Sequence, residues 1–204
     1  ETGVAHGTLT VVVGGDPIEV TTYRVDGAYR DGRHPDAVSF AGSIEEDLAR
    51  RDFTVNAMAF HPSRGLLDPF GGQADLAAGI LRTVGDPRER FAEDALRILR
   101  GCRFASQLGF ALEEATWAAA VSQKSLLARV SAERIFHELD GLLRGEHVHD
   151  ALLGTADALS FVLPELVAMQ GFPQATPYHI YDVLEHTAWA VQHVPPEPLL
   201  RWAA

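Results

Sequence analysis

The segment that decides the fold is RFAEDALRILRGCRF, residues 90–104. Its apolar residues recur at helical spacing, which predicts one helix over the whole segment. Asp94, Arg97, Arg100 and Arg103 follow one another every three residues, and residues three apart are neighbours on a helix surface. The segment therefore predicts a ridge of one carboxylate and three guanidinium groups along the helix.

Two interpretations of this ridge are open on the segment alone. In the first, it is a solvent-exposed face with salt bridges, and Glu93 and Arg97 form an i,i+4 pair. In the second, Asp94 and Arg97 present a hydrogen-bond acceptor beside a donor fork to a ligand. The residues that precede the helix decide between the two.

Composition bounds the class of protein. The 204 residues are 47% hydrophobic and 22% charged, as in a soluble globular protein of one or two domains. No apolar run approaches the roughly 20 residues of a membrane span, and the first residues lack the pattern of a signal peptide. Cys102 is the only cysteine, which excludes an internal disulfide. We expect a cytoplasmic protein without a membrane partner, and the oligomeric state stays open.

The formal net charge of −11 argues against a nucleic-acid binder, because phosphate contacts need clustered basic residues. The distribution of the basic residues along the chain weakens this argument. Lys124 is the only lysine, and arginines concentrate at residues 50–51 and between residues 82 and 103. Arginine suits bidentate recognition of phosphates and base edges. A local basic groove in an acidic molecule is therefore compatible with the composition.

The N-terminal part predicts a β-hairpin. The runs Thr8–Val13 and Ile18–Tyr23 are β-rich, and the turn residues 14–17 (Gly-Gly-Asp-Pro) join them. Glu19 alternates with its apolar neighbours, so it points to the opposite face of its strand. This carboxylate is either a solvated strand residue or a metal ligand at the edge of an active site, and the hairpin alone does not distinguish them.

A compact polar cluster follows the next predicted helix. Ser43 and Glu46 form a capping box that opens a helix to Arg51. Arg51, Asp52 and Asn56 then lie among residues of buried type. They are either caps and surface pairs or the wall of a ligand pocket, and their closeness favours the pocket, because core packing does not require such groups.

The remaining chain changes from mixed to helical structure. A short helix (73–78) and a strand-like run (80–84) precede the stop signal Gly-Asp-Pro at 85–87, and every later periodic segment predicts a helix. We expect an α+β fold: part of a head with an antiparallel hairpin and helices (1–84), an all-α neck that binds nucleotide and RNA (85–145), and a helical C-terminal segment (146–204).

Three motifs carry a resemblance to a known family. They are RRDFTVNA (50–57), DPFGG (68–72) and the segment 90–104, and residues 6–8, 19–24 and 31–35 extend the match. In order and spacing they resemble motifs of the bacterial-type tRNA nucleotidyltransferases, the CCA-adding enzymes, which have bacterial poly(A) polymerases and A-adding enzymes as close relatives. The resemblance runs from about residue 3 to about residue 143.

The resemblance implies an activity and roles for residues. The activity would be template-independent addition of C and A to tRNA 3′ ends from CTP and ATP, by phosphoryl transfer with two Mg²⁺ ions. Residues 68–72 would join head and neck. The implied site residues are Glu19 (catalytic and metal-binding), Arg51, Asp52 and Asn56 (triphosphate and ribose), Asp94 and Arg97 (base edge), and Arg100 and Arg103 (further nucleotide contacts).

Base chemistry agrees with this assignment. Cytosine and adenine both present an exocyclic amino donor beside a ring-nitrogen acceptor, so a carboxylate next to a guanidinium satisfies both. Uracil and guanine place a carbonyl where the amino group was, so their oxygen would face Asp94 acceptor to acceptor. Unpaired buried polar groups can discriminate by roughly 10⁴-fold. One helix with Asp94 and Arg97 could thus select C and A without a nucleic-acid template.

The sequence also departs from the family. The family places its metal-binding carboxylates in an Asp-x-Asp pair ahead of the hairpin, and this chain has no Asp-x-Asp. Glu19 alone cannot hold two metal ions. We therefore expect a fragment that lacks the first part of the head and is inactive by itself. Robust nucleotide incorporation by these 204 residues would contradict this expectation.

Three alternatives stay open. The first is poly(A) or A-only addition, which the same base-reading pair would serve. The second is a non-catalytic module that binds RNA or nucleotide. The third is a metal phosphohydrolase, because residues 177–187 resemble the opening helix of an HD-type domain in which His186 would be the first metal ligand. His179 and His186 are equally compatible with ordinary surface or core histidines.

Overall fold

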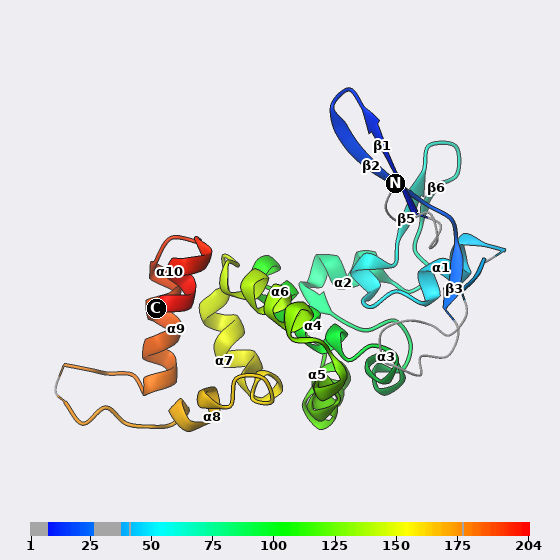
Figure 1. The fold of residues 1–204 in the computed structure, drawn as a ribbon. Helices are drawn as coiled ribbons and strands as arrows, with labels where there is room; N and C mark the ends of the chain where they lie inside the picture. Colours follow the sequence, from blue (N-terminus) through cyan, green and yellow to red (C-terminus); the bar gives the residue numbers. More distant parts are fainter. Residues whose placement is uncertain (1–7, 27–37, 41, 177) are drawn as a thin grey trace.

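The structure is a computed structural model that describes residues 8–26, 38–40, 42–176 and 178–204. Figure 1 shows an elongated molecule, with hairpins at one end and a row of helices that leads to the C-terminus at the other. The strands of the described part form four two-stranded sheets. This combination of small, mainly antiparallel sheets with helices confirms the predicted α+β class.

The first hairpin pairs β1 (Thr8–Val13) with β2 (Asp16–Thr21) in antiparallel register. Gly14 and Gly15 make the turn with φ of +63° and +100°, a region that glycine adopts without steric cost. The predicted hairpin is confirmed, although residues 16 and 17 belong to the second strand and not to the turn. Glu19 is exposed on this hairpin.

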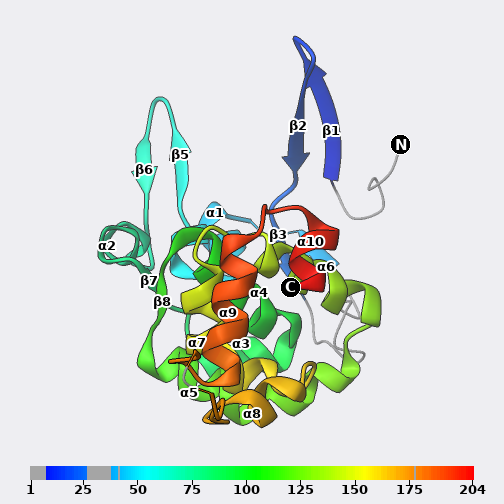
Figure 2. The same cartoon turned by 90° about the vertical axis from the view of Figure 1, so that its left-hand side faces the viewer.

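Short elements complete the N-terminal part. They are β3 (Arg24–Asp26), β4 (Val38–Phe40), α1 (Ile44–Ala49), the 3₁₀ turn η2 (Thr54–Asn56), β5 (Ala59–His61), β6 (Gly65–Leu67), α2 (Gly72–Ala78) and β7 (Ile80–Leu81). The predicted capping box is confirmed, because the Ser43 side chain accepts a hydrogen bond from the Glu46 N–H. The β5–β6 hairpin was not predicted, and Figure 2 shows it projecting in the same direction as β1–β2.

The C-terminal part is mostly helical. Its elements are α3 (Pro87–Glu93), α4 (Leu96–Leu108), β8 (Ala111–Leu112), α5 (Glu114–Gln123), the 3₁₀ helix η3 (Lys124–Arg129), α6 (Ala132–Leu143), α7 (Val148–Leu159), α8 (Glu165–Met169), α9 (Val183–His193) and α10 (Pro198–Ala203). The sequence did not predict α8, α10 or β8, which are too short to show a period. No helix of the described residues is long and apolar enough to cross a membrane.

The single helix predicted over residues 90–104 is wrong, because the chain breaks between α3 and α4. Asp94 has extended backbone angles, φ −143° and ψ 104°. Its carboxylate accepts a hydrogen bond from the Leu96 N–H at 3.1 Å, so it competes with the helical backbone as short acidic side chains do. Arg97, Arg100 and Arg103 keep their shared spacing on α4, while Asp94 sits at the break before it.

Two hydrophobic clusters organise the molecule around α4. The larger one collects buried residues from α3 to α9, among them Phe91, Ile98 and Leu127. A smaller one joins Phe53 and Leu81 of the N-terminal part to α4 and α7. Strand β7 also pairs in parallel with β8. The boundary expected at residues 84/85 stays a prediction, and core packing crosses it.

Candidate nucleotide-binding site

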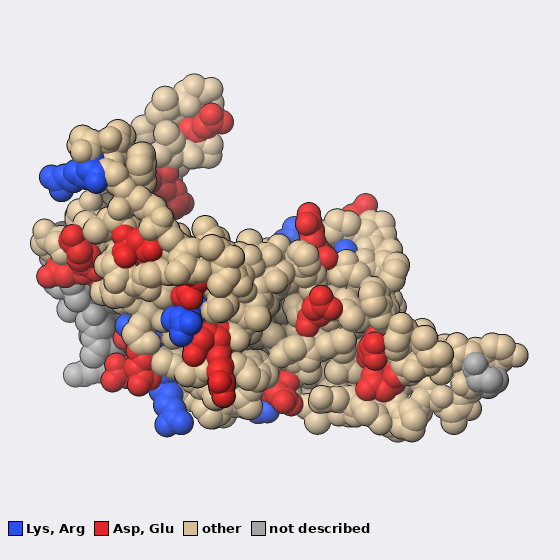
Figure 3. Space-filling view, turned by 180° about the vertical axis from the view of Figure 1, so that it is seen from behind, with Lys and Arg blue, Asp and Glu red and all other residues tan. Residues whose placement is uncertain are grey.

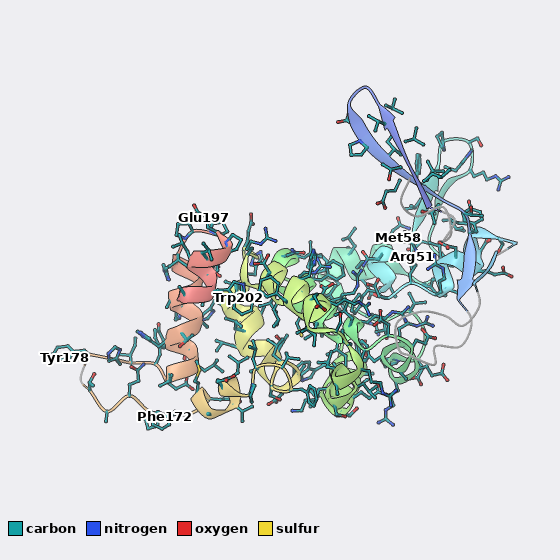
Figure 4. All side chains as sticks on the ribbon, in the orientation of Figure 1. Arg51, Met58, Phe172, Tyr178, Glu197 and Trp202 are labelled. Carbon is teal, nitrogen blue, oxygen red and sulfur yellow. The ribbon has the colours of Figure 1, made fainter. Side chains whose placement is uncertain are left out.

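A cavity of about 440 Å³ lies where the N-terminal part meets α4. Its volume is within the usual range for a small-molecule site. It is lined by Arg50, Arg51, Asp52, Asn56, Asp94, Leu96, Arg97, Arg100, Phe104 and Arg134. Figure 4 labels Arg51 beside α1, where the small sheets meet the row of helices. Six of the predicted nucleotide-binding residues therefore meet in one place, although they are spread over 50 positions of the sequence.

The cavity is basic in an acidic chain. Its lining contains five arginines and two aspartates, against a formal net charge of −11 for the whole sequence. On the face shown in Figure 3, acidic side chains are spread widely and basic ones are few. A concentration of guanidinium groups in a concave site favours an anionic ligand with phosphate groups.

Backbone pairing positions Asp52 at the cavity. The Val84 N–H donates to the Asp52 carbonyl at 3.0 Å, and the Thr54 N–H donates to the Arg82 carbonyl at 2.9 Å. Phe53, between them, is fully buried in the smaller hydrophobic cluster. Because side chains alternate along an extended segment, burial of Phe53 turns Asp52 towards the opposite side, where the cavity lies.

Asp52 and Arg100 form the ion pair at the centre of the site. Arg100 donates to Asp52 Oδ2 from Nε at 2.7 Å and from Nη2 at 2.6 Å. Asn56 Nδ2 and the Phe53 N–H both donate to Asp52 Oδ1. Burial acts to raise the pKa of Asp52, but the Arg100 charge and these hydrogen bonds outweigh it and hold the pKa below its ordinary value.

Asp94 is fixed at both carboxylate oxygens. Oδ1 accepts the Leu96 N–H, and Oδ2 accepts Arg134 Nη2 at 2.8 Å. An ionised carboxylate has about four acceptor positions, so about two remain for a ligand. Asp94 is therefore an oriented acceptor that lines the cavity.

Arg97 is held just as firmly. Its Nη1 donates to Glu93 Oε2 at 2.6 Å and to the Arg90 carbonyl at 3.0 Å, and its Nη2 donates to the Arg50 carbonyl at 3.0 Å. These bonds use three of the five guanidinium N–H groups. Within the described part of the chain, the Nε–H and one Nη2–H have no partner. The predicted ion pair with Glu93 is thus confirmed, and the presentation of Arg97 to a ligand stays a prediction that these spare donors leave possible.

Arg51 extends the site at its rim. Its Nη2 donates to Asp47 Oδ2 at 3.1 Å, and 46% of its side chain is exposed. Asp47 itself is buried and also pairs with Arg50. A half-exposed guanidinium anchored by one carboxylate is placed to meet a phosphate group that enters from solvent.

Arg103 does not line the cavity. Its Nε donates to the buried carboxylate of Glu138, its Nη1 donates to Gln107, and its guanidinium lies 4.3 Å from the centre of the Phe104 ring. Its aliphatic stem covers Gly141, where a Cβ would come within 2.5 Å of Arg103 Cδ. The structure therefore gives Arg103 a role in packing α4 against α6, and its predicted contact with the nucleotide stays a prediction.

Two family models match the chain. One, described as the poly A polymerase head domain, matches residues 1–82. The other, described as a probable RNA and SrmB-binding site of polymerase A, matches residues 109–169. The chain belongs to the tRNA nucleotidyltransferase and poly(A) polymerase family.

Individual relatives agree with the family models. The chain is 49% identical to a CCA-adding enzyme of Geobacillus kaustophilus over 169 residues, which is 82% of this chain and 42% of that enzyme. It superposes on the crystal structure of Bacillus stearothermophilus CCA-adding enzyme in complex with CTP with a TM-score of 0.69 and 44% identity, over 76% of this chain and 37% of that one.

A second solved structure is a tRNA nucleotidyltransferase complexed with a primer tRNA and an incoming ATP analogue. The TM-score is 0.62 at 31% identity, over 83% of this chain and 46% of that one. The chain thus spans about half or less of the length of the family members that it matches.

The two predicted metal ligands, Glu19 and His186, do not line this cavity. They also lie far apart in the sequence. Glu19 is exposed on the β1–β2 hairpin. His186 lies on α9, with its ring 5.0 Å from that of His179. The described residues contain no group of three or more histidine, cysteine, aspartate or glutamate side chains that could hold a metal ion. The roles of Glu19 and His186 stay predictions, and the residues 6–7 and 31–35 of the resemblance lie outside the described part of the chain.

Sequence reasoning missed Arg134 and Phe104 as cavity residues. Arg134 is 40 positions from its partner Asp94, and no spacing rule connects residues so far apart. The sequence offered no signal for Arg134 beyond its position in a segment with helical periodicity. Phe104 ends the quoted segment, and Arg100 lies 5.3 Å from its ring centre, a distance suited to a cation–π contact.

Proposed function

We propose that the chain contains the nucleotide-selecting part of a CCA-adding nucleotidyltransferase, which adds C and A to tRNA 3′ ends from CTP and ATP without a template. One observation carries this proposal: the cavity brings several arginines together with an oriented acceptor, Asp94, and an oriented donor, Arg97. The relatives named above support C and A addition over the poly(A) alternative.

In this proposal Asp94 and Arg97 read the edge of the base. The spare acceptor positions of Asp94 take the amino group of cytosine or adenine, and the spare N–H groups of Arg97 donate to the adjacent ring nitrogen. Uracil and guanine would bring a carbonyl oxygen to Asp94, so an acceptor would face an acceptor in a half-buried site. Selection follows because neither side chain can rotate freely to suit the wrong base.

The remaining side chains serve the sugar and the phosphates. Arg51 and Arg100 supply positive charge, and Asp52 and Asn56 supply an acceptor and a donor for ribose hydroxyl groups. Because the pKa of Asp52 is held low, its carboxylate stays ionised at neutral pH and continues to bind Arg100. Arg103 acts indirectly, through the packing of α4.

The family resemblance also implies two Mg²⁺ ions, which supply charge stabilisation and activate the attacking hydroxyl when bound. The described residues do not fit such a site, since they contain no group of three or more histidine, cysteine, aspartate or glutamate side chains that could hold a metal ion. We therefore assign this chain the binding and selection of the nucleotide and derive no bond-making step. The tRNA is the proposed partner, with residues 109–169 as its proposed contact, and the cytoplasm is the proposed location.

Equilibrium binding tests the proposal. Titration calorimetry with CTP, ATP, UTP and GTP in the presence of Mg²⁺ should show CTP and ATP preferred, and Asp94→Ala and Arg97→Ala should each remove the preference. Arg129→Ala is a matched control, because Arg129 lies at the end of η3 and does not line the cavity. Equal binding of all four nucleotides by the unaltered chain would overturn the proposal.

A further inference from the structure

The carboxylate of Asp94 reaches the cavity from a break in the helical backbone, and this makes its orientation depend on other groups. Residue 94 belongs to neither α3 nor α4. Its side chain therefore lacks the restriction that the preceding turn of a helix places on χ1. The Leu96 N–H holds one oxygen, and a single hydrogen bond leaves rotation about that oxygen open.

Arg134 supplies the second fixed point. Its Nη2 lies 2.8 Å from Asp94 Oδ2, and the two side chains are 26% and 18% exposed. A charge-assisted hydrogen bond of this kind is short and directional. Two bonds on opposite oxygens define the plane of the carboxylate, which neither bond does alone.

Helix α6 holds Arg134 in place relative to α4. Four residues after Arg134, Glu138 is buried and pairs with Arg103 on α4. Further along, the Ser106 hydroxyl of α4 donates to the Leu142 carbonyl at 2.6 Å. Residues i and i+4 share a helix face, so the face of α6 that carries Arg134 is the face attached to α4.

The cavity gives Asp94 competing partners if Arg134 is removed. Four other guanidinium groups line the same cavity, among them those of Arg97 and Arg100. A carboxylate bound at one oxygen only could turn towards one of them, because opposite charges attract strongly in a partly buried site. Its acceptor position would then no longer match the amino group of cytosine or adenine.

We propose that Arg134 is a positioning residue that sets the choice of base by orienting Asp94. This inference rests on the proposed function and deepens it: Asp94 and Arg97 read the base, and Arg134 from a separate helix makes the reading selective. Arg134 does not need to touch the nucleotide to have this effect.

The test compares Arg134→Met, which keeps the length of the stem and removes the charge, with Arg134→Lys, which keeps the charge. Calorimetric titrations with CTP, ATP, UTP and GTP give four affinities for each variant. For Arg134→Met we expect the ratio of CTP to UTP affinity to fall by about tenfold, the loss expected for one charge-assisted hydrogen bond. Arg134→Lys should recover most of the ratio.

The matched control is Arg144→Met. Arg144 caps the C-terminal end of α6 and, like Arg134, pairs with an aspartate, Asp140, at 2.7 Å. It does not line the cavity, so its loss should leave all four affinities unchanged. Circular dichroism and thermal unfolding confirm that each variant folds. If the role of Arg134 were purely structural, the affinities for all four nucleotides would fall together and the ratio of CTP to UTP affinity would not change.

The outcomes separate this inference from the proposed function. An unaltered chain that prefers CTP and ATP, together with an Arg134→Met variant that keeps the full preference, would overturn the inference alone. If Arg134→Met does not fold, Arg134→Gln, which also removes the charge, takes its place: a reduced preference in Arg134→Gln together with a recovered preference in Arg134→Lys would support the inference, and a full preference in Arg134→Gln would overturn it. An unaltered chain without any preference would overturn both.

Discussion

Asp52 and Arg100 are 48 residues apart in the sequence, and their side chains meet at 2.6 Å in the wall of the cavity. Asp52 is held by backbone pairing with the segment that precedes α3, and Arg100 is held by α4. The ion pair is therefore a direct electrostatic link between the N-terminal part and the helical part of the molecule. Its loss should be visible in stability as well as in binding.

Replacing Asp52 with asparagine should lower the free energy of unfolding at pH 7 by about 1–3 kcal/mol, because it leaves Arg100 without its charged partner. Chemical denaturation at pH 7 measures this change. Glu165→Gln is the control, since Glu165 is exposed at the start of α8 and should change stability little. An unfolding free energy equal to that of the unaltered chain would contradict the assigned ion pair.

The same pair predicts a pH dependence. The folded state holds the pKa of Asp52 below its ordinary value of 3.8, so the stabilisation is fully present above about pH 4 and is lost as the pH falls through the lower, folded-state pKa. In chemical denaturation between pH 7 and pH 3, the free energy of unfolding should fall less for Asp52→Asn than for the unaltered chain. Parallel curves for the two proteins would argue against this contribution.

Arg103→Met tests the packing role of Arg103. The variant keeps the stem over Gly141 but leaves the buried Glu138 with only a distant contact to Arg100, at 3.9 Å. We expect a loss of about 1–3 kcal/mol in unfolding free energy, with the ratio of CTP to UTP affinity unchanged. A changed ratio of CTP to UTP affinity with unchanged stability would instead support the nucleotide contact of Arg103 that the sequence predicted.

Two glycines should respond in opposite ways to alanine. At Gly72 a Cβ would lie 2.3 Å from the Thr54 carbonyl oxygen and 2.9 Å from Met58 Cγ, so Gly72→Ala should destabilise the chain by about 1–3 kcal/mol through overpacking. Figure 4 labels Met58 in this region of the N-terminal part. Thermal or chemical unfolding measures the effect.

Gly154 is the matched comparison. It lies inside α7, and a Cβ there meets nothing within 4 Å. Gly154→Ala should therefore stabilise the chain by about 0.5–1 kcal/mol, because alanine loses less backbone freedom in a helix. Equal effects of the two substitutions would contradict the close approach of α2 to η2.

Cys102 should be unreactive in the folded chain. It is almost completely buried, and burial raises the pKa of its thiol to about 12, while the thiolate is the reactive form. Iodoacetamide at pH 8 should leave the native chain unmodified, as measured by mass spectrometry, and should modify it fully in denaturant. Rapid modification without denaturant would show that the core around α4 opens.

Local chemistry allowed several features to be predicted from the sequence. The two-glycine turn, the Ser43–Glu46 capping box and the stop at residues 85–87 each depend on contacts within a few residues, which a sequence displays directly. The motifs at residues 50–57 and 90–104 likewise contained the six predicted site residues that line the cavity. The break at Asp94 was missed, because a short carboxylate that captures the Leu96 N–H leaves the apolar period almost intact.

The sequence by itself determined which residue types form the site and that they belong to a nucleotidyltransferase family. Only the tertiary structure decided what each of them does. Because α6 packs on α4, Arg134 pairs with Asp94 and Glu138 pairs with Arg103. Arg97, Arg100 and Arg103 therefore have different partners, although they are evenly spaced in the sequence. The physical reason is that a guanidinium binds the nearest carboxylate in space, and distances between helices are set by core packing that no local pattern contains.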